Sequence, residues 1–214
     1  MSQPAVIALN EKHSLAIRLW HWITFLSITA SLVTVLLGST LFKTKDNVSV
    51  VQNQLQEKGA IVTKDQAWAV AHEFSDKLWD THKFIGYFLS FLLLSRFLIE
   101  IAQPQDEKLK ARIKNALGFK TNSPDEIKGQ KHYLLVMRGH LVFYLIFLIM
   151  ALTGLGLAFE DAPVLKDLHK SIKSVHSFVQ YFVYGYILLH LIGVVRSDLG
   201  KSKGIVSGMI NGKP

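Results

Sequence analysis

The stretch that decides the fold is SVHSFVQYFVYGYILLHLIGVV, residues 174–195, which contains no Asp, Glu, Lys or Arg. Two more windows, Leu19–Phe42 and Gly139–Phe159, also lack these four residue types. A fourth window, Phe84–Ile99, is apolar apart from Arg96. A helix needs about 20 consecutive apolar residues to cross a bilayer, and helices of water-soluble proteins rarely hold such runs. The chain is therefore predicted to be an integral membrane protein, which excludes the water-soluble enzyme classes.

Composition narrows the chemistry further. The 214 residues include no cysteine, which excludes disulfides, cysteine-ligated clusters and covalently attached c-type haem. Nine histidines are the remaining plentiful metal ligands. The net charge of +8 could suit nucleic acid, but no basic groove with interleaved aromatic residues is present. In a membrane protein an excess of Lys and Arg marks the cytoplasmic loops, so no nucleic-acid partner is expected.

The apolar windows predict an all-α fold, a bundle of four transmembrane helices. Spans are predicted at about residues 19–42, 81–102, 139–159 and 174–195 of one membrane domain (1–214), with polar connections at 43–80 and 103–138. The first window is too long for a signal-peptide core of about 7–15 residues, so it is read as a retained span. The leader Met1–Ile17 is predicted to be partly helical. The apolar spacing in Lys64–Trp79 predicts an amphipathic helix lying on the membrane surface.

Loop charge predicts the orientation. The segment 96–138 holds nine Lys and Arg, and the tail 196–214 holds four. The connection 160–173 holds three, and the longer segment 43–83 holds six, balanced by six acidic residues. Under the positive-inside rule, both termini and the second connection lie in the cytoplasm. The six cations of segment 43–83 make it the weakest part of this assignment.

Histidine inside a span is costly and usually faces the interior of the bundle. His176 and His190 are 14 residues apart, so on a helix they project within about 40° of one another. At a rise of about 1.5 Å per residue they are separated by about 21 Å along the axis. One lies near each membrane surface, and both are predicted to point into the bundle.

Depth then suggests partners for these two histidines. His21 is the third residue of a span that starts inside, so it shares the inner half with His190. His82 starts a span on the outer side, so it shares the outer half with His176. Two facing imidazoles per leaflet are what bis-histidine ligation of two b-type haems requires.

Other readings of these histidines remain open. Taken singly, each could be an interfacial residue, as the flanking Trp20 and Trp22 suggest for His21. A zinc or copper site lacks a nearby carboxylate in the apolar windows, and a proton relay has only Glu100 as an acidic candidate. His169 is the most credible substitute ligand, seven residues before His176.

Several motifs together resemble the bacterial cytochrome b561 and nickel–hydrogenase cytochrome b superfamily. They are Arg18-Leu19-Trp20-His21-Trp22, His82-Lys83-Phe84-Ile85-Gly86-Tyr87 with Arg96, His140-Leu141-Val142-Phe143-Tyr144 with Leu152-Thr153-Gly154, and the pair His176 and His190. Each motif is weak alone, but their order and spacing over all four spans are specific.

The resemblance implies a four-helix bundle in the bacterial inner membrane that holds two b haems. It also implies electron exchange between the quinone pool and a redox partner, as an electron-transfer oxidoreductase component of a respiratory chain. Carried over, the haem ligands are His21 with His190 and His82 with His176, in agreement with the depth argument. The long connections could form a docking surface for a partner subunit, as in an anchor subunit of a hydrogenase. A non-redox four-span scaffold or transporter subunit is the rival class, and it would be colourless.

Further residues are candidates for supporting roles. Arg18 and Arg96 could neutralise the propionates of the inner haem, or extend to the lipid headgroups. His140 could contact a propionate or a quinone carbonyl. Four glycines lie within spans, where they leave room for a macrocycle or for close helix packing: Gly86, Gly154, Gly185 and Gly193.

Overall fold

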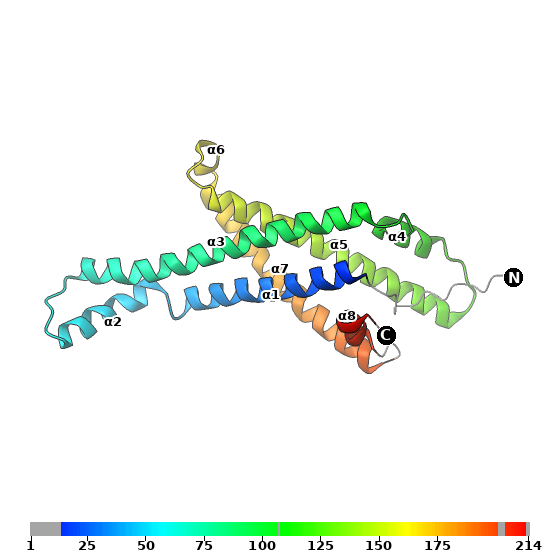
Figure 1. The fold of residues 1–214 in the computed structure, drawn as a ribbon, viewed down its shortest axis with the longest axis horizontal. Coiled ribbons are helices and arrows are strands. Elements are labelled where there is room, and N and C mark those ends of the chain that lie inside the picture. Colours follow the sequence, from blue (N-terminus) through cyan, green and yellow to red (C-terminus); the bar gives the residue numbers. More distant parts are fainter. Residues whose placement is uncertain (1–13, 107, 201–203, 213–214) are drawn as a thin grey trace. The chain divides into compact units, whose positions relative to one another are not determined.

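The computed structural model describes residues 14–106, 108–200 and 204–212, and this part of the chain is almost entirely helical with no strand. The helices are α1 (Leu15–Ser39), α2 (Thr44–Glu57), α3 (Lys64–Ala102), α4 (Leu109–Gly118), α5 (Pro124–Ala158), α6 (Pro163–Lys166), α7 (His169–Leu199) and α8 (Ile205–Asn211) (Figure 1). The all-α prediction is confirmed. Most of the predicted helical leader, with His13, lies outside the described residues.

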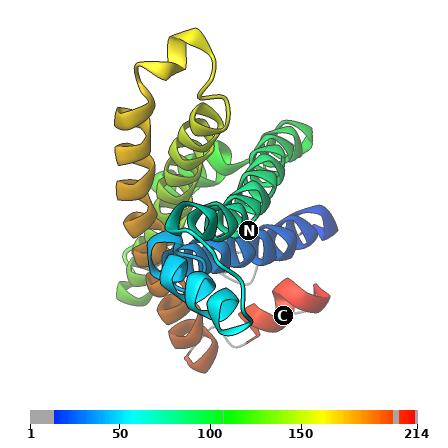
Figure 2. The same cartoon turned by 90° about the vertical axis from the view of Figure 1, so that its left-hand side faces the viewer.

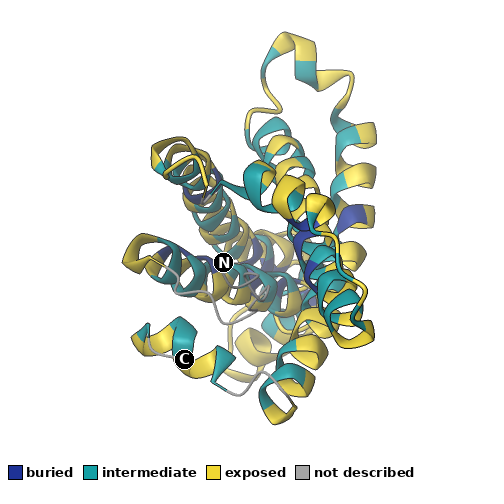
Figure 3. Ribbon diagram, turned by 90° about the vertical axis from the view of Figure 1, so that its right-hand side faces the viewer, coloured by how far each residue is buried: buried dark blue, intermediate teal, exposed yellow. Residues whose placement is uncertain are grey.

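Four helices, α1, α3, α5 and α7, are long and apolar enough to cross a membrane. Their surfaces carry large apolar side chains that no other part of the described chain covers, as the exposed positions in Figure 3 indicate. Phe84 is 72% exposed and Leu189 is 70% exposed. Such surfaces are stable in contact with lipid and not in water. The chain is an integral membrane protein with four candidate spanning helices.

Three of these helices, α3, α5 and α7, extend well beyond the predicted spans. α3 has 39 residues, which at a rise of about 1.5 Å per residue makes it about 58 Å long. The segment Lys64–Trp79 is thus helical, but it continues directly into the second span instead of forming a separate surface helix. No Gly or Pro lies between Lys64 and Phe84 to interrupt it. Likewise α5 begins at Pro124, inside the connection predicted as polar, because proline suits the first turn of a helix.

The chain divides into two compact units, one of which comprises residues 23–91. Within it, α2 folds back on the beginning of α3 as a helical hairpin (Figure 1). Small side chains make the contact, since Val48 of α2 packs against Ala67 and Ala71 of α3, and Ala67 is fully buried. Gly59, with φ of 84°, takes the left-handed conformation just after α2.

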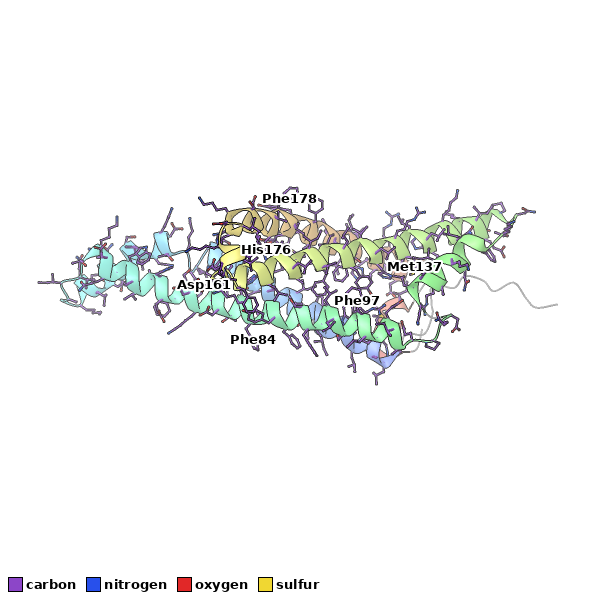
Figure 4. The ribbon with its side chains drawn as sticks, turned by 90° about the horizontal axis from the view of Figure 1, so that it is seen from above. Phe84, Phe97, Met137, Asp161, His176 and Phe178 are labelled. Atoms are coloured by element: carbon purple, nitrogen blue, oxygen red, sulfur yellow. The ribbon has the colours of Figure 1, made fainter. Side chains whose placement is uncertain are left out.

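The other unit comprises residues 1–22 and 92–214. In it α5 and α7 lie side by side, and the short α6 lies in the turn that joins them (Figure 2). α4 packs on the beginning of α5 through Ala116, Tyr133 and Met137. Figure 4 shows Met137 toward that end of α5 and His176 toward the end of α7 nearest α6.

Candidate functional site

The structure brings His21 and His190 together, in the unit of residues 1–22 and 92–214. Their ring centroids are 6.3 Å apart and their planes are inclined at 52°. Two imidazoles that bind one metal ion along a common axis, with bonds of about 2.0 Å and ring atoms about 1.1 Å from the ring centre, have centroids about 6 Å apart. The observed centroid separation is close to this value.

Aromatic rings surround this pair of histidines. Trp22 meets His21 edge-on at a centroid distance of 5.3 Å. Tyr186 lies nearly parallel to His190, at 6.1 Å and 8°, and Phe143 packs on Tyr186 at 4.9 Å. These rings make the surroundings apolar and restrict how the imidazoles can turn.

His176 is held by the adjacent helix of its own unit. Its Nδ1 lies 2.8 Å from the hydroxyl of Thr153 in α5, and that hydroxyl donates to the carbonyl of Ile149 at 2.6 Å. The next residue is Gly154, where an added Cβ would lie only 3.3 Å from Cε1 of His176. The absence of a side chain at Gly154 thus lets the imidazole lie close against α5.

His82 has a matching neighbourhood in the unit of residues 23–91. Its Nδ1 lies 2.8 Å from the hydroxyl of Thr34 in α1, which donates to the carbonyl of Ser31 at 2.6 Å. Trp79, one helical turn earlier, meets the His82 ring edge-on at 5.5 Å. His82 and His176 belong to different units.

A polar cluster occupies the end of α3. Arg96 donates from Nε to the hydroxyl of Tyr144 at 2.9 Å and from Nη2 to the carboxylate of Glu100 at 2.9 Å. Glu100 also accepts the backbone N–H of Leu109 at 2.6 Å, which ties α4 to α3. The Arg96 side chain is only 11% exposed, and its Nη1 is buried with no hydrogen-bond partner among the described residues. Arg96 is therefore paired on one side and has one donor left for another acceptor.

Arg18 has a partner at the C-terminal end of the described chain. It donates from Nη1 to the carbonyl of Ile210 in α8 at 3.0 Å, and its guanidinium carbon lies 3.0 Å from the position that a Cβ on Gly212 would take. A cation at the C-terminus of a helix interacts favourably with the unpaired carbonyls there. Beside it, Trp22 donates to the carbonyl of Met209. Arg18 thus docks α8 on the beginning of α1.

Two other histidines named by the sequence have less definite roles. His140 lies in α5 and is half-buried. His169, the substitute ligand considered above, has its Nδ1 2.7 Å from the carboxylate of Glu160, so it already has a charged partner.

Comparison with known proteins decides the family. The family model described as prokaryotic cytochrome b561 matches residues 12–212, nearly the whole chain. The chain belongs to the prokaryotic cytochrome b561 family. No curated protein and no solved structure matches it in the corresponding searches. Membership makes the protein a helical membrane protein of a family of b-type cytochromes that transfer electrons.

The residues present fit the haem that the b561 family implies. The 6.3 Å separation of His21 and His190 suits two axial ligands, and their aromatic surroundings suit an apolar cofactor. Within residues 14–106, 108–200 and 204–212, no three His, Asp or Glu side chains gather as a metal-binding group. Haem does not require one, because the porphyrin supplies the remaining four ligands and the protein only the axial pair.

The sequence predicted the histidines, and Thr153 appeared in it only as part of a family motif, without a role beside a histidine. Thr34 and Thr153 carried a usable signal, since each is a hydroxyl residue inside a span at the depth expected for a histidine on another span. Glu100 as the partner of Arg96 follows from the i, i+4 spacing on a helix. The contact between Arg18 and α8 has no such local signal, because it joins residues 192 positions apart.

Proposed function

We propose that the protein transfers electrons across the membrane through two bis-histidine b-type haems, an inner one held by His21 and His190 and an outer one held by His82 and His176. The electrons pass between the quinone or quinol pool and a redox partner. The observation that carries this proposal is the His21–His190 separation, which suits axial ligation of a single iron.

The outer pair rests on two further arguments. The 14-residue spacing places His176 about 21 Å from His190 along α7, near the opposite membrane surface. His82 and His176 also share the same local arrangement, with a threonine hydroxyl 2.8 Å from Nδ1. This arrangement directs the other ring nitrogen, Nε2, to a metal.

The bound haems would supply one-electron chemistry, and the residues of the chain supply its conditions. The four histidines would hold the two irons, and the aromatic rings of Trp22, Tyr186 and Phe143 line one side of the inner pair. Arg96, through its remaining Nη1 donor, is proposed to bind an anionic or carbonyl oxygen at the inner surface, such as a propionate or a quinone oxygen. His140 is proposed to contact a propionate or a quinone carbonyl at the same surface. Arg18 is the weaker candidate for binding a propionate, because its guanidinium already donates to the carbonyl of Ile210 in α8.

The membrane location extends this proposal. The four apolar helices support an integral protein in contact with lipid, and we propose the inner membrane of a bacterium as its location. Four crossings place both termini on one side, and loop charge favours the cytoplasm. α3, at about 58 Å, is nearly twice as long as the bilayer core of about 30 Å is thick. The extra length favours a related role as the cytochrome b anchor of a larger oxidoreductase such as a hydrogenase.

Haem stoichiometry of the purified full chain tests the proposal. We expect about two haems per chain, with a Soret band and a reduced α band. His176→Ala and His82→Ala should each remove one haem, and His21→Ala should remove the other. His132→Ala, at an exposed position on α5, is the control and should retain both. A colourless protein after expression with sufficient haem would refute the proposal and favour a non-redox scaffold or transporter.

A further inference from the structure

The hydroxyls of Thr34 and Thr153 favour one position of the proton on the imidazole rings of His82 and His176, respectively. A threonine hydroxyl has a single proton to donate. Thr34 donates it to the carbonyl of Ser31 and Thr153 to that of Ile149, each at 2.6 Å. Each oxygen can then only accept from the histidine Nδ1, 2.8 Å away. This arrangement favours the tautomer of His82 and His176 that has the proton on Nδ1 and the lone pair on Nε2, and at His82 the Ser31 hydroxyl also lies 3.5 Å from Nδ1.

We propose that Thr34 and Thr153 are positioning residues that set the tautomer and the electron-donating strength of His82 and His176, and so lower the reduction potential of the outer haem. This inference rests on the proposed function, in which those two histidines hold that haem. It assigns the threonines a role that the haem ligands alone do not imply.

The direction of the effect follows from the hydrogen bond. A ligating histidine that donates its other N–H to an acceptor becomes more basic, and a more basic ligand favours the more highly charged, oxidised metal. Removing the acceptor weakens that preference, so the haem becomes easier to reduce. The two bonds come from two different helices, Thr34 from α1 and Thr153 from α5, so the effect can be measured separately for each ligand.

The arrangement at Thr153 is supported by its neighbour. Gly154 lets the His176 ring lie against α5, at 3.3 Å from the position of an added Cβ. The ring is thus held by the hydroxyl and by the flat surface of the helix beside it. A hydroxyl that only satisfied its own helix would not need this close approach.

The test replaces each hydroxyl by a methyl group of similar shape, in Thr34→Val and Thr153→Val. The control is Thr29→Val, since Thr29 also donates to a carbonyl of its own helix, that of Phe25, and makes no hydrogen bond to a histidine of the described residues. The readouts are haem content and the two midpoint potentials, with the outer haem assigned as the one lost in His176→Ala. We expect both haems to be retained. The equilibrium constant for reduction of the outer haem should rise about fivefold, or about 40 mV for a one-electron couple, in each valine variant.

Serine variants complete the experiment. Thr34→Ser and Thr153→Ser keep the hydroxyl and should restore the parental potential, whereas a merely structural role for the methyl group would predict the opposite. The inference fails if the valine variants shift the outer potential no more than Thr29→Val does, or if both haems shift equally. If His82→Ala and His176→Ala both retain two haems, the proposed function fails first, and this inference fails with it.

Discussion

Replacing Gly154 by alanine places a methyl group against the proposed outer ligand. The new Cβ would lie 3.3 Å from Cε1 of His176, whereas carbon atoms in favourable contact are about 3.5–4.0 Å apart. The imidazole must therefore move by about 0.2–0.7 Å. Its bond to the Thr153 hydroxyl, 2.8 Å long, is lengthened or bent by such a movement.

The energetic consequence can be estimated from two opposing effects. Overpacking of a filled contact costs about 1–3 kcal/mol. Alanine stabilises a helix relative to glycine by about 1 kcal/mol. We expect Gly154→Ala to be destabilised by up to about 2 kcal/mol and to bind less of the outer haem. The control is Gly139→Ala on the same helix, where nothing lies within 4 Å of the new Cβ. This variant should only be stabilised, by the higher helix propensity of alanine.

Thermal unfolding in detergent, followed by helical circular dichroism, would measure the stability of both variants, and the Soret band would measure their haem content. The decisive comparison is between the two alanines, because both remove one glycine from α5. If Gly154→Ala unfolds at the same temperature as Gly139→Ala and keeps the parental haem spectrum, the close approach of His176 to α5 contributes neither to stability nor to haem binding.

Three further predictions concern the rest of the chain. Glu100→Ala should destabilise the protein by about 3 kcal/mol, since it leaves Arg96 largely buried without its ion partner, and unchanged thermal unfolding would contradict this. Ala67→Leu should detach α2 from α3 at a cost of about 1–3 kcal/mol, because Ala67 is fully buried; limited proteolysis should then cut α2 first, and an unaltered cleavage pattern would argue against it. Since the chain has no cysteine, Lys120→Cys and Asp161→Cys can be labelled singly in intact cells. An impermeant maleimide should label position 161 and not 120, and the reverse pattern would invert the orientation.

The sequence was sufficient for features that depend on composition alone. Three windows without charged residues, and a fourth that is apolar apart from Arg96, located the four spanning helices, because a bilayer imposes the same requirement on every crossing segment. The spacing of His176 and His190 and the depth of His21 predicted which histidines to compare, and the structure brings His21 and His190 together.

The remaining features depend on contacts that no local pattern encodes. The sequence predicts a separate surface helix before residue 81, because the polar residues of Lys64–Trp79 do not suit a membrane span. The helix continues through this segment, since it contains no Gly or Pro to break it. The hydroxyl of Thr153 has a role only because α5 and α7 lie side by side. The partner of Arg18 lies in α8, and finding it requires the folded chain.

The uninterrupted helix α3 has a mechanical consequence. His82 and the α2 hairpin belong to one unit, and no loop or glycine separates them along α3. The helix between Lys64 and His82 spans 18 residue steps and forms a stiff rod of about 27 Å. A protein that bound the α2 hairpin and rotated it would therefore also rotate the segment that carries His82. Because α3 is continuous there, no hinge lies between the two. Docking of a partner on the α2 hairpin and the alignment of His82, the proposed haem ligand, would then be parts of a single rigid movement.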